Sequence, residues 1–79
     1  MKNVDITPAQ SRAARGLLSM TQAQLATASG LGQSTVIDFE KERRAVSSQA
    51  IASISKALEN AGVEFIAENG GGAGVRLRK

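Results

Sequence analysis

The sequence between Thr21 and Phe39 has the spacing of two short helices that cross at a sharp turn. Ala26 places a small side chain where the two helices would approach most closely. Gly30 follows four residues later and can adopt the positive φ angle that a tight connection requires. Val36 and Phe39 then supply apolar side chains at the offsets that pack the second helix back onto the first. This spacing predicts a compact pair of helices in the middle of the chain.

Two copies of one capping pattern predict where the first two helices begin. Thr7 and Gln10 have the spacing of a capping box, and Pro8 stands at the first helical position, where its missing N–H costs nothing. Thr21 and Gln24 repeat the same box. The expected helices cover residues 8–18 and the segment from Thr21 to a stop at Gly30.

Two further helices follow from apolar residues at helical spacing. The third is expected over residues 33–41, and the fourth runs from a cap at Ser47 to a stop at Gly62. The charged residues from Glu40 to Arg44 are interpreted as a break between these two helices. The predicted core residues are Ala13, Ala14, Leu17 and Leu18 in the first helix, Val36 and Phe39 in the third, and Ile51, Ile54 and Leu58 in the fourth.

After Gly62 the period of the apolar residues changes from 3.6 to 2, which is typical of β-strands. Two alternating runs flank the glycine-rich segment 69–74, so the end of the chain is predicted to form a β-hairpin. The fold class is therefore mainly α, with four helices and a C-terminal β-hairpin. The expected division is a helical domain over residues 1–62 and a hairpin over residues 63–79 packed on it.

The hairpin is expected to pack on the fourth helix and to take part in a two-fold dimer. An open strand edge invites pairing with another strand, and a symmetric pair of copies would satisfy both edges. Opposite charges on the two strands can also pair across the hairpin. The packing residues are Val63, Phe65, Val75 and Leu77, and the charged ones are Glu64 and Glu68 opposite Arg76 and Arg78.

Composition excludes several classes of function. The chain has no histidine and no cysteine, which removes the commonest general base, disulfides and most zinc sites. No other residues are arranged for catalysis, so we expect no enzyme, cofactor or metal. No apolar run approaches the roughly 20 residues of a membrane span, and the N-terminus lacks the layout of a signal peptide. A cytoplasmic, nucleoid-associated protein is expected.

The net charge of +3 permits nucleic-acid binding without establishing it. Basic and acidic residues balance as far as Asn69, and the surplus lies at the end of the chain, in Arg76, Arg78 and Lys79. The only aromatic residues are two phenylalanines, which are expected in the core. Stacking on single-stranded bases is therefore disfavoured, and double-stranded DNA is the better partner.

The central helix pair and its neighbours resemble the phage-repressor (Cro/C1, or XRE-like) helix-turn-helix family. The resemblance spans residues 6–61 and depends on Thr21–Ala26, Gly30, Gln33–Val36 and Phe39–Glu40. It implies that the third helix enters the major groove with its N-terminal residues. The family commonly adds a fifth helix where this chain has strand-like sequence. The resemblance therefore leaves the mode of dimerisation open.

The resemblance also implies which residues contact DNA. Base edges would be read by Gln33, Ser34, Thr35 and Asp38, because glutamine can bind adenine in a bidentate manner and a carboxylate can accept from the cytosine amino group. Asp38 has a second interpretation, in which it holds Arg43 or Arg44, since a lone carboxylate near phosphates is repelled. The expected phosphate contacts are Gln22, Arg43, Arg44, Arg12 and Arg15.

The function expected from the sequence is a sequence-specific regulator of transcription that binds double-stranded DNA. A homodimer acting as a repressor would bind a pseudo-palindromic operator with half-sites about 10 bp apart. An antitoxin-type protein is the alternative; it would regulate its own operon and neutralise a toxin partner by direct contact. A protein-interaction module without DNA binding fits less well, because the third helix begins with polar side chains that suit a DNA groove.

Overall fold

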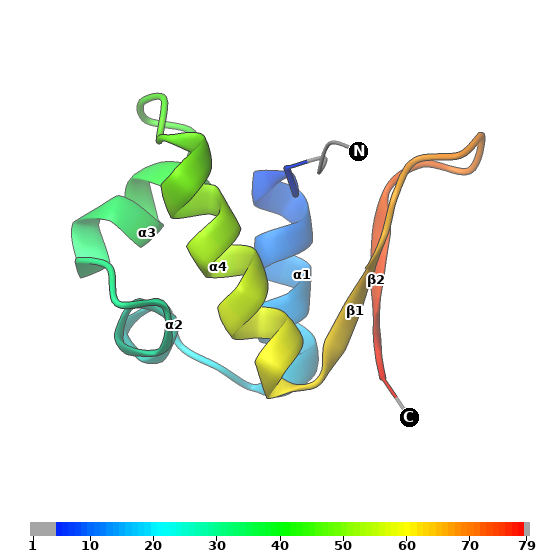
Figure 1. Ribbon diagram of the computed structural model, residues 1–79, viewed down its shortest axis with the longest axis horizontal. Coiled ribbons are helices and arrows are strands. Elements are labelled where there is room, and N and C mark those ends of the chain that lie inside the picture. The colour runs from blue at the N-terminus through cyan, green and yellow to red at the C-terminus, as the bar shows by residue number, and fades with distance from the viewer. Residues whose placement is uncertain (1–4, 79) are drawn as a thin grey trace.

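The computed structural model describes residues 5–78, and it confirms a mainly helical fold with a C-terminal hairpin. Residues 1–4 of the expected helical domain and Lys79 of the expected hairpin lie outside this range. The helices and the hairpin lie at opposite ends of the longest dimension, which is 32 Å, with α3 at one end and the strands at the other (Figure 1). The elements are α1 (Pro8–Leu18), α2 (Gln22–Ser29), α3 (Gln33–Glu40), α4 (Ser48–Ala61), β1 (Val63–Ile66) and β2 (Gly74–Leu77).

Both predicted capping boxes are present. The Thr7 hydroxyl accepts from the Gln10 backbone N–H at 3.1 Å, and the Gln10 side chain accepts from the Thr7 N–H at 2.8 Å. Thr21 and Gln24 make the same pair of bonds at 3.0 and 2.9 Å. Ser47 caps α4 by accepting from the Ala50 N–H. Local side-chain chemistry therefore sets three of the four helix starts.

The core lies where the four helices and β1 meet. Its fully buried apolar side chains are Ala14, Leu25, Val36, Ile54, Leu58 and Val63. The prediction for α1 was wrong in part, because Ala13 is exposed and 44% of Leu17 is exposed. The buried face of α1 runs through Gln10, Ser11 and Ala14, so residues 13 and 17 lie on its solvent side.

The two strands pair antiparallel with Val63 opposite Leu77 and Ile66 opposite Gly74. Glu64 lies opposite Arg76, and their side chains form the expected cross-strand ion pair at 2.7 Å. The expected pairing does not extend to Glu68 and Arg78, which form no ion pair within residues 5–78. The Arg78 backbone N–H donates to the Gly62 carbonyl, so Arg78 lies beside the residue that precedes β1. Glu68 follows the other end of that strand.

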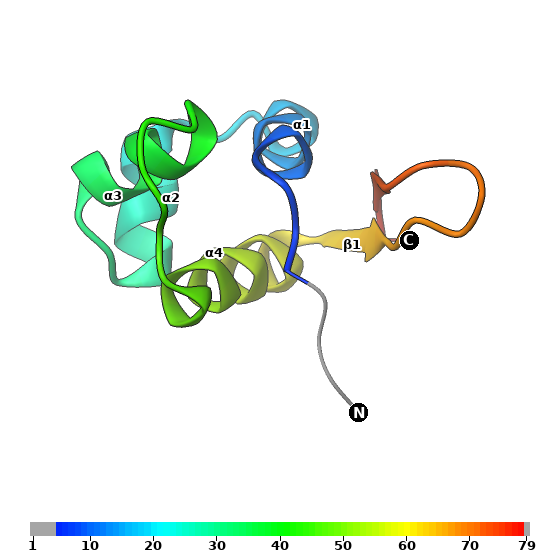
Figure 2. The same cartoon turned by 90° about the horizontal axis from the view of Figure 1, so that it is seen from above.

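The hairpin packs on α4 as expected, and it also packs on α1, which the sequence did not predict. β1 follows directly from α4 and contacts it, whereas β2 lies along α1. Viewed from above, the hairpin projects beyond both helices on the side away from α3 (Figure 2). Val63, Phe65 and Val75 contribute to the core, but 47% of Leu77 is exposed.

Gln10 explains why β2 stays against α1. Besides completing the capping box, its side-chain amide donates to the Gly74 carbonyl at 2.8 Å and to the Ile66 carbonyl at 3.3 Å. One buried side chain therefore starts the first helix and holds both strands.

Candidate nucleic-acid interface

The α2–α3 pair has the tight connection predicted from its spacing. Gly30 is the C-cap of α2, and its φ of 76° is a conformation that L side chains rarely adopt. The Leu31 N–H donates to the Ala26 carbonyl at 3.1 Å, which closes the turn. Ala26, Val36 and Phe39 are all buried, so the second helix packs back on the first as expected.

The first turn of α3 presents polar side chains to solvent. Gln33 and Ser34 are exposed and adjacent, whereas Thr35 is half-buried. Gly32 precedes the helix, and no side chain among residues 5–78 caps this end. The Thr35 N–H donates to the Gly32 carbonyl at 3.1 Å, so it is the N–H groups of Gln33 and Ser34 that keep their capacity to bind an acceptor from outside the chain.

Asp38 is brought together with the two arginines that follow α3. Its Oδ2 accepts from Nε of Arg44 at 2.7 Å, and its Oδ1 lies 3.9 Å from Nη1 of Arg43. This geometry corresponds to the second interpretation of Asp38, in which the carboxylate holds an arginine.

Glu40 is the centre of a polar cluster that sequence reasoning missed. Its side chain is completely buried and accepts from Ser11 at 2.5 Å, from Gln22 at 3.0 Å and from Arg15 at 2.7–3.1 Å. Interpreting Glu40 as the start of a charged break was wrong, because α3 includes it. The helical period was the available signal, since residues 36, 39 and 40 share the face of α3 that points to the core.

The cluster keeps Glu40 ionised although it is buried. Burial by itself raises the pKa of the carboxyl. The hydrogen bonds from Arg15, Ser11 and Gln22, together with the charge of Arg15, lower the pKa by more than burial raises it. The net effect is a pKa below the ordinary value. Glu40 therefore links α1, α2 and α3 as a carboxylate.

The residues expected to contact phosphate fall into two groups. Gln22, Arg12 and Arg15 belong to the Glu40 cluster, where Arg12 donates to the Glu40 carbonyl oxygen. Arg15 also donates to the Met20 carbonyl through Nη1, so each of its nitrogens has a partner inside the protein. Arg43 and Arg44 belong instead to the Asp38 group, and their side chains are 60% and 55% exposed.

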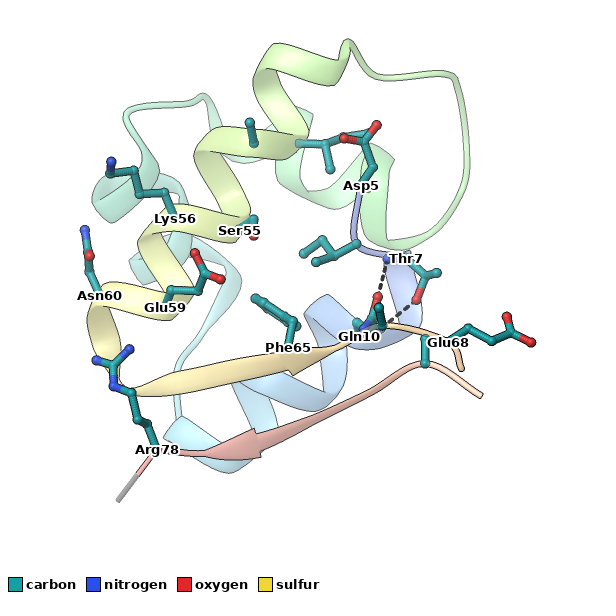
Figure 3. Close-up of a pocket in the computed structure, with 15 residues that line it drawn as sticks. Asp5, Thr7, Gln10, Ser55, Lys56, Glu59, Asn60, Phe65, Glu68 and Arg78 are labelled. Atoms are coloured by element: carbon teal, nitrogen blue, oxygen red, sulfur yellow. Dashed lines mark hydrogen bonds between the residues drawn. The ribbon is translucent and has the colours of Figure 1, made fainter. Parts of the chain in front are cut away.

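A groove of about 870 Å³ lies between α4, the segment before α1 and the hairpin (Figure 3). Phe65 points into it from β1, and Lys56 and Glu59 line it from α4. Arg78 and Glu68 contribute charges of both signs from the ends of the hairpin. No residue of α2 or α3 lines this groove, so it is separate from the surface formed by the first turn of α3.

None of the described helices is long and apolar enough to cross a membrane. No curated protein matches the chain. A family model for helix-turn-helix domains matches residues 12–65, which include α2, α3, α4 and most of α1. The helix order, the closed turn at Gly30 and this match agree, and they show that the chain belongs to the Cro/C1-type (XRE-like) helix-turn-helix family of DNA-binding transcription regulators.

Proposed function

We propose that the protein is a sequence-specific regulator, acting as a repressor, that binds a pseudo-palindromic operator in double-stranded DNA as a dimer. The observation that carries the proposal is the first turn of α3, where Gln33 and Ser34 are exposed on a helix whose other face is fixed by buried Val36 and Phe39. A rigid helix with polar groups at its N-terminal end fits the major groove.

We assign the reading of bases to Gln33 and Ser34, with half-buried Thr35 at the edge of the contact. Arg43 and Arg44 are the main phosphate contacts, because their exposed guanidinium groups follow α3 directly. Gln22 and Arg12 can contribute at the other end of the motif. Arg15 is the weakest of the expected phosphate contacts, because binding DNA would require it to leave partners inside the protein.

The proposed dimer uses the outer edge of β2. The Arg78 N–H donates to the Gly62 carbonyl. Given the register of the strands, this bond implies that Glu64 with Arg76, and Ile66 with Gly74, are the hydrogen-bonded pairs of the ladder. The backbone polar groups of Val75 and Leu77 therefore point away from β1. Among residues 5–78, Leu77 and Leu17 are the exposed large apolar residues, and β2 lies along α1. A second copy pairing here would satisfy the edge and cover apolar surface.

Leu77→Glu tests this interface by light scattering. It is expected to convert the dimer to a monomer, because the added charge would face its own copy across the axis. Gln49→Glu adds the same charge on α4 and should leave the mass unchanged. A Leu77→Glu protein that remains a dimer would rule out the β2 edge.

The first test of function is selection of duplex DNA from a random library by the purified protein, at near-physiological salt. An enriched palindrome with half-sites one helical turn apart is the expected result. In each copy α3 and β2 lie at opposite ends of the molecule. Two copies joined at β2 must therefore both be tilted toward the DNA for their α3 helices to lie one helical turn apart. Weak, salt-sensitive binding without enrichment would contradict sequence-specific recognition.

The groove beside α4 supports the antitoxin role as a second candidate, because a protein partner could bind there while α3 remains on DNA. Co-expression with the product of an adjacent gene tests this role. Relief of growth inhibition by the protein, weakened by Lys56→Glu in the groove, is the expected outcome. Toxicity that the protein does not relieve would count against the candidate.

A further inference from the structure

The carboxylate of Asp38 is engaged on both oxygens, whereas its partners stay open to solvent. Asp38 lies in the second turn of α3, and only 18% of its side chain is exposed. Arg44 donates to Oδ2 through Nε at 2.7 Å, and Nη1 of Arg43 lies 3.9 Å from Oδ1. More than half of each arginine side chain is exposed. The aspartate is therefore the inner member of the group.

The backbone after α3 brings the two arginines back beside this carboxylate. The Arg43 N–H donates to the Asp38 carbonyl at 2.9 Å. Glu42 has a φ of 57°, a left-handed conformation that is uncommon for a residue with a side chain. This conformation reverses the chain, so that Arg44 returns to α3 six residues after Asp38. The turn at Glu42 and the ion pairs with Asp38 therefore both hold the guanidinium groups of Arg43 and Arg44 beside α3.

We propose that Asp38 is a positioning residue: its carboxylate holds the guanidinium groups of Arg44 and Arg43 beside α3 as a clamp for DNA phosphates and does not read a base. The inference rests on the proposed function, because such a clamp requires α3 to meet duplex DNA. Asp38 uses Nε of Arg44, which leaves the two terminal nitrogens of this exposed guanidinium available for a bidentate contact with a phosphate.

Charge and energetics both favour this role over base reading. The one negative and two positive charges of Asp38, Arg43 and Arg44 leave a net charge of +1, which attracts phosphates, whereas a free carboxylate would repel them. To accept from a cytosine amino group, Asp38 would have to release Arg44. An exposed ion pair contributes little to folding stability. Its main consequence is that Arg44 loses less conformational freedom when DNA binds.

The test compares Asp38→Asn with Glu42→Gln as a matched control, measured as affinity for duplex DNA at several salt concentrations. Each variant removes one negative charge from the same region, and Glu42 is exposed and forms no ion pair with any residue between 5 and 78. Charge alone predicts that both variants bind more tightly. The positioning role predicts that only Glu42→Gln does, and that Asp38→Asn binds all duplexes roughly two- to tenfold more weakly.

A double-variant cycle with Arg44→Ala completes the test. Once Arg44 is absent, Asp38→Asn should cause a much smaller loss, because only the longer contact with Arg43, at 3.9 Å, is left for it to break. The NMR signal of the Arg44 Nε–H should shift in Asp38→Asn without DNA, and the thermal midpoint should stay near that of the wild type. These two readouts separate a lost ion pair from a damaged fold.

Three outcomes are distinguishable. Tighter or unchanged binding by Asp38→Asn overturns the positioning role, and so does a changed preference at one base pair, which would make Asp38 a base reader. The cycle uses any duplex, so failure to enrich an operator tests the proposed function separately. A wild-type protein that binds no duplex at all contradicts the proposed function and, with it, the clamp.

Discussion

Arg15 of α1 and Glu40 of α3 form a bidentate ion pair in which the carboxylate side chain is completely buried. Removing two charges from water costs several kcal/mol for each ion, which only good geometry and further hydrogen bonds can offset. Ser11 and Gln22 supply those bonds. The pair joins the first helix to the end of the third, and therefore fixes α3 relative to the rest of the domain.

Replacing Arg15 by leucine should destabilise the fold strongly, because Glu40 would remain as a buried charge without its cation. Loss of one partner of a buried pair typically costs about 3–5 kcal/mol. That is much of the total stability of a domain of this size. Urea unfolding followed by circular dichroism measures the change. The double variant Arg15→Leu with Glu40→Leu should recover part of the loss, and equal destabilisation in both would contradict this account.

Stability should fall in acid because of Glu40. Its pKa in the folded protein lies below the ordinary value of 4.5, so the folded state favours the ionised form. The resulting stabilisation is fully present above the unfolded pKa and is lost as the pH falls through the folded pKa. Urea midpoints measured from pH 7 to pH 2 test this. Glu40→Gln should flatten the acid limb of the curve, and an unchanged limb would show that other carboxyls cause it.

Much of the fold followed from short-range signals in the sequence. The boxes at Thr7 and Thr21, the stop at Gly30 and the change of period after Gly62 each involve neighbouring residues, so the helix and strand positions were predicted closely. The Glu40 cluster was not, because its members come from three helices. A buried glutamate and an exposed one look alike in sequence until the packing partner is known. Contacts distant in sequence also explain why β2 lies on α1.

The candidate interface was predictable to a similar depth. The resemblance to the helix-turn-helix family predicted that Gln33 and Ser34 face the DNA, and the structure shows both residues exposed in the first turn of α3. The sequence left two interpretations of Asp38 open, because the answer depends on the path of the loop through Glu42. Glu42 adopts a left-handed conformation although it is not glycine, asparagine or aspartate, so the residue type gave no signal that predicted the turn.

Gln10→Ala should cost more than Gln24→Ala, although both residues occupy the same capping-box position. Loss of an N-cap side chain typically costs about 0.5–2 kcal/mol, and each glutamine change removes only the reciprocal bond of the box and leaves the threonine cap in place. Gln10 also donates to the Ile66 and Gly74 carbonyls, and each such bond contributes roughly 0.5–1.5 kcal/mol. Urea unfolding of the two variants measures the difference. Equal losses would mean that the amide of Gln10 does not hold the hairpin.

Gln33→Ala and Arg43→Ala should weaken DNA binding in different ways. Gln33 lies on the exposed first turn of α3, where a bidentate contact with one base discriminates by about 1–3 kcal/mol. Its loss should reduce affinity for the preferred site and blur the preference at one base pair. Arg43 is exposed beside α3, so its loss should weaken binding to all sequences and reduce the log–log salt slope by about one unit.

Fluorescence anisotropy with the selected operator and a scrambled duplex, at several salt concentrations, separates the two effects. Identical changes in affinity, preference and slope would show that the division between reading and clamping residues is wrong.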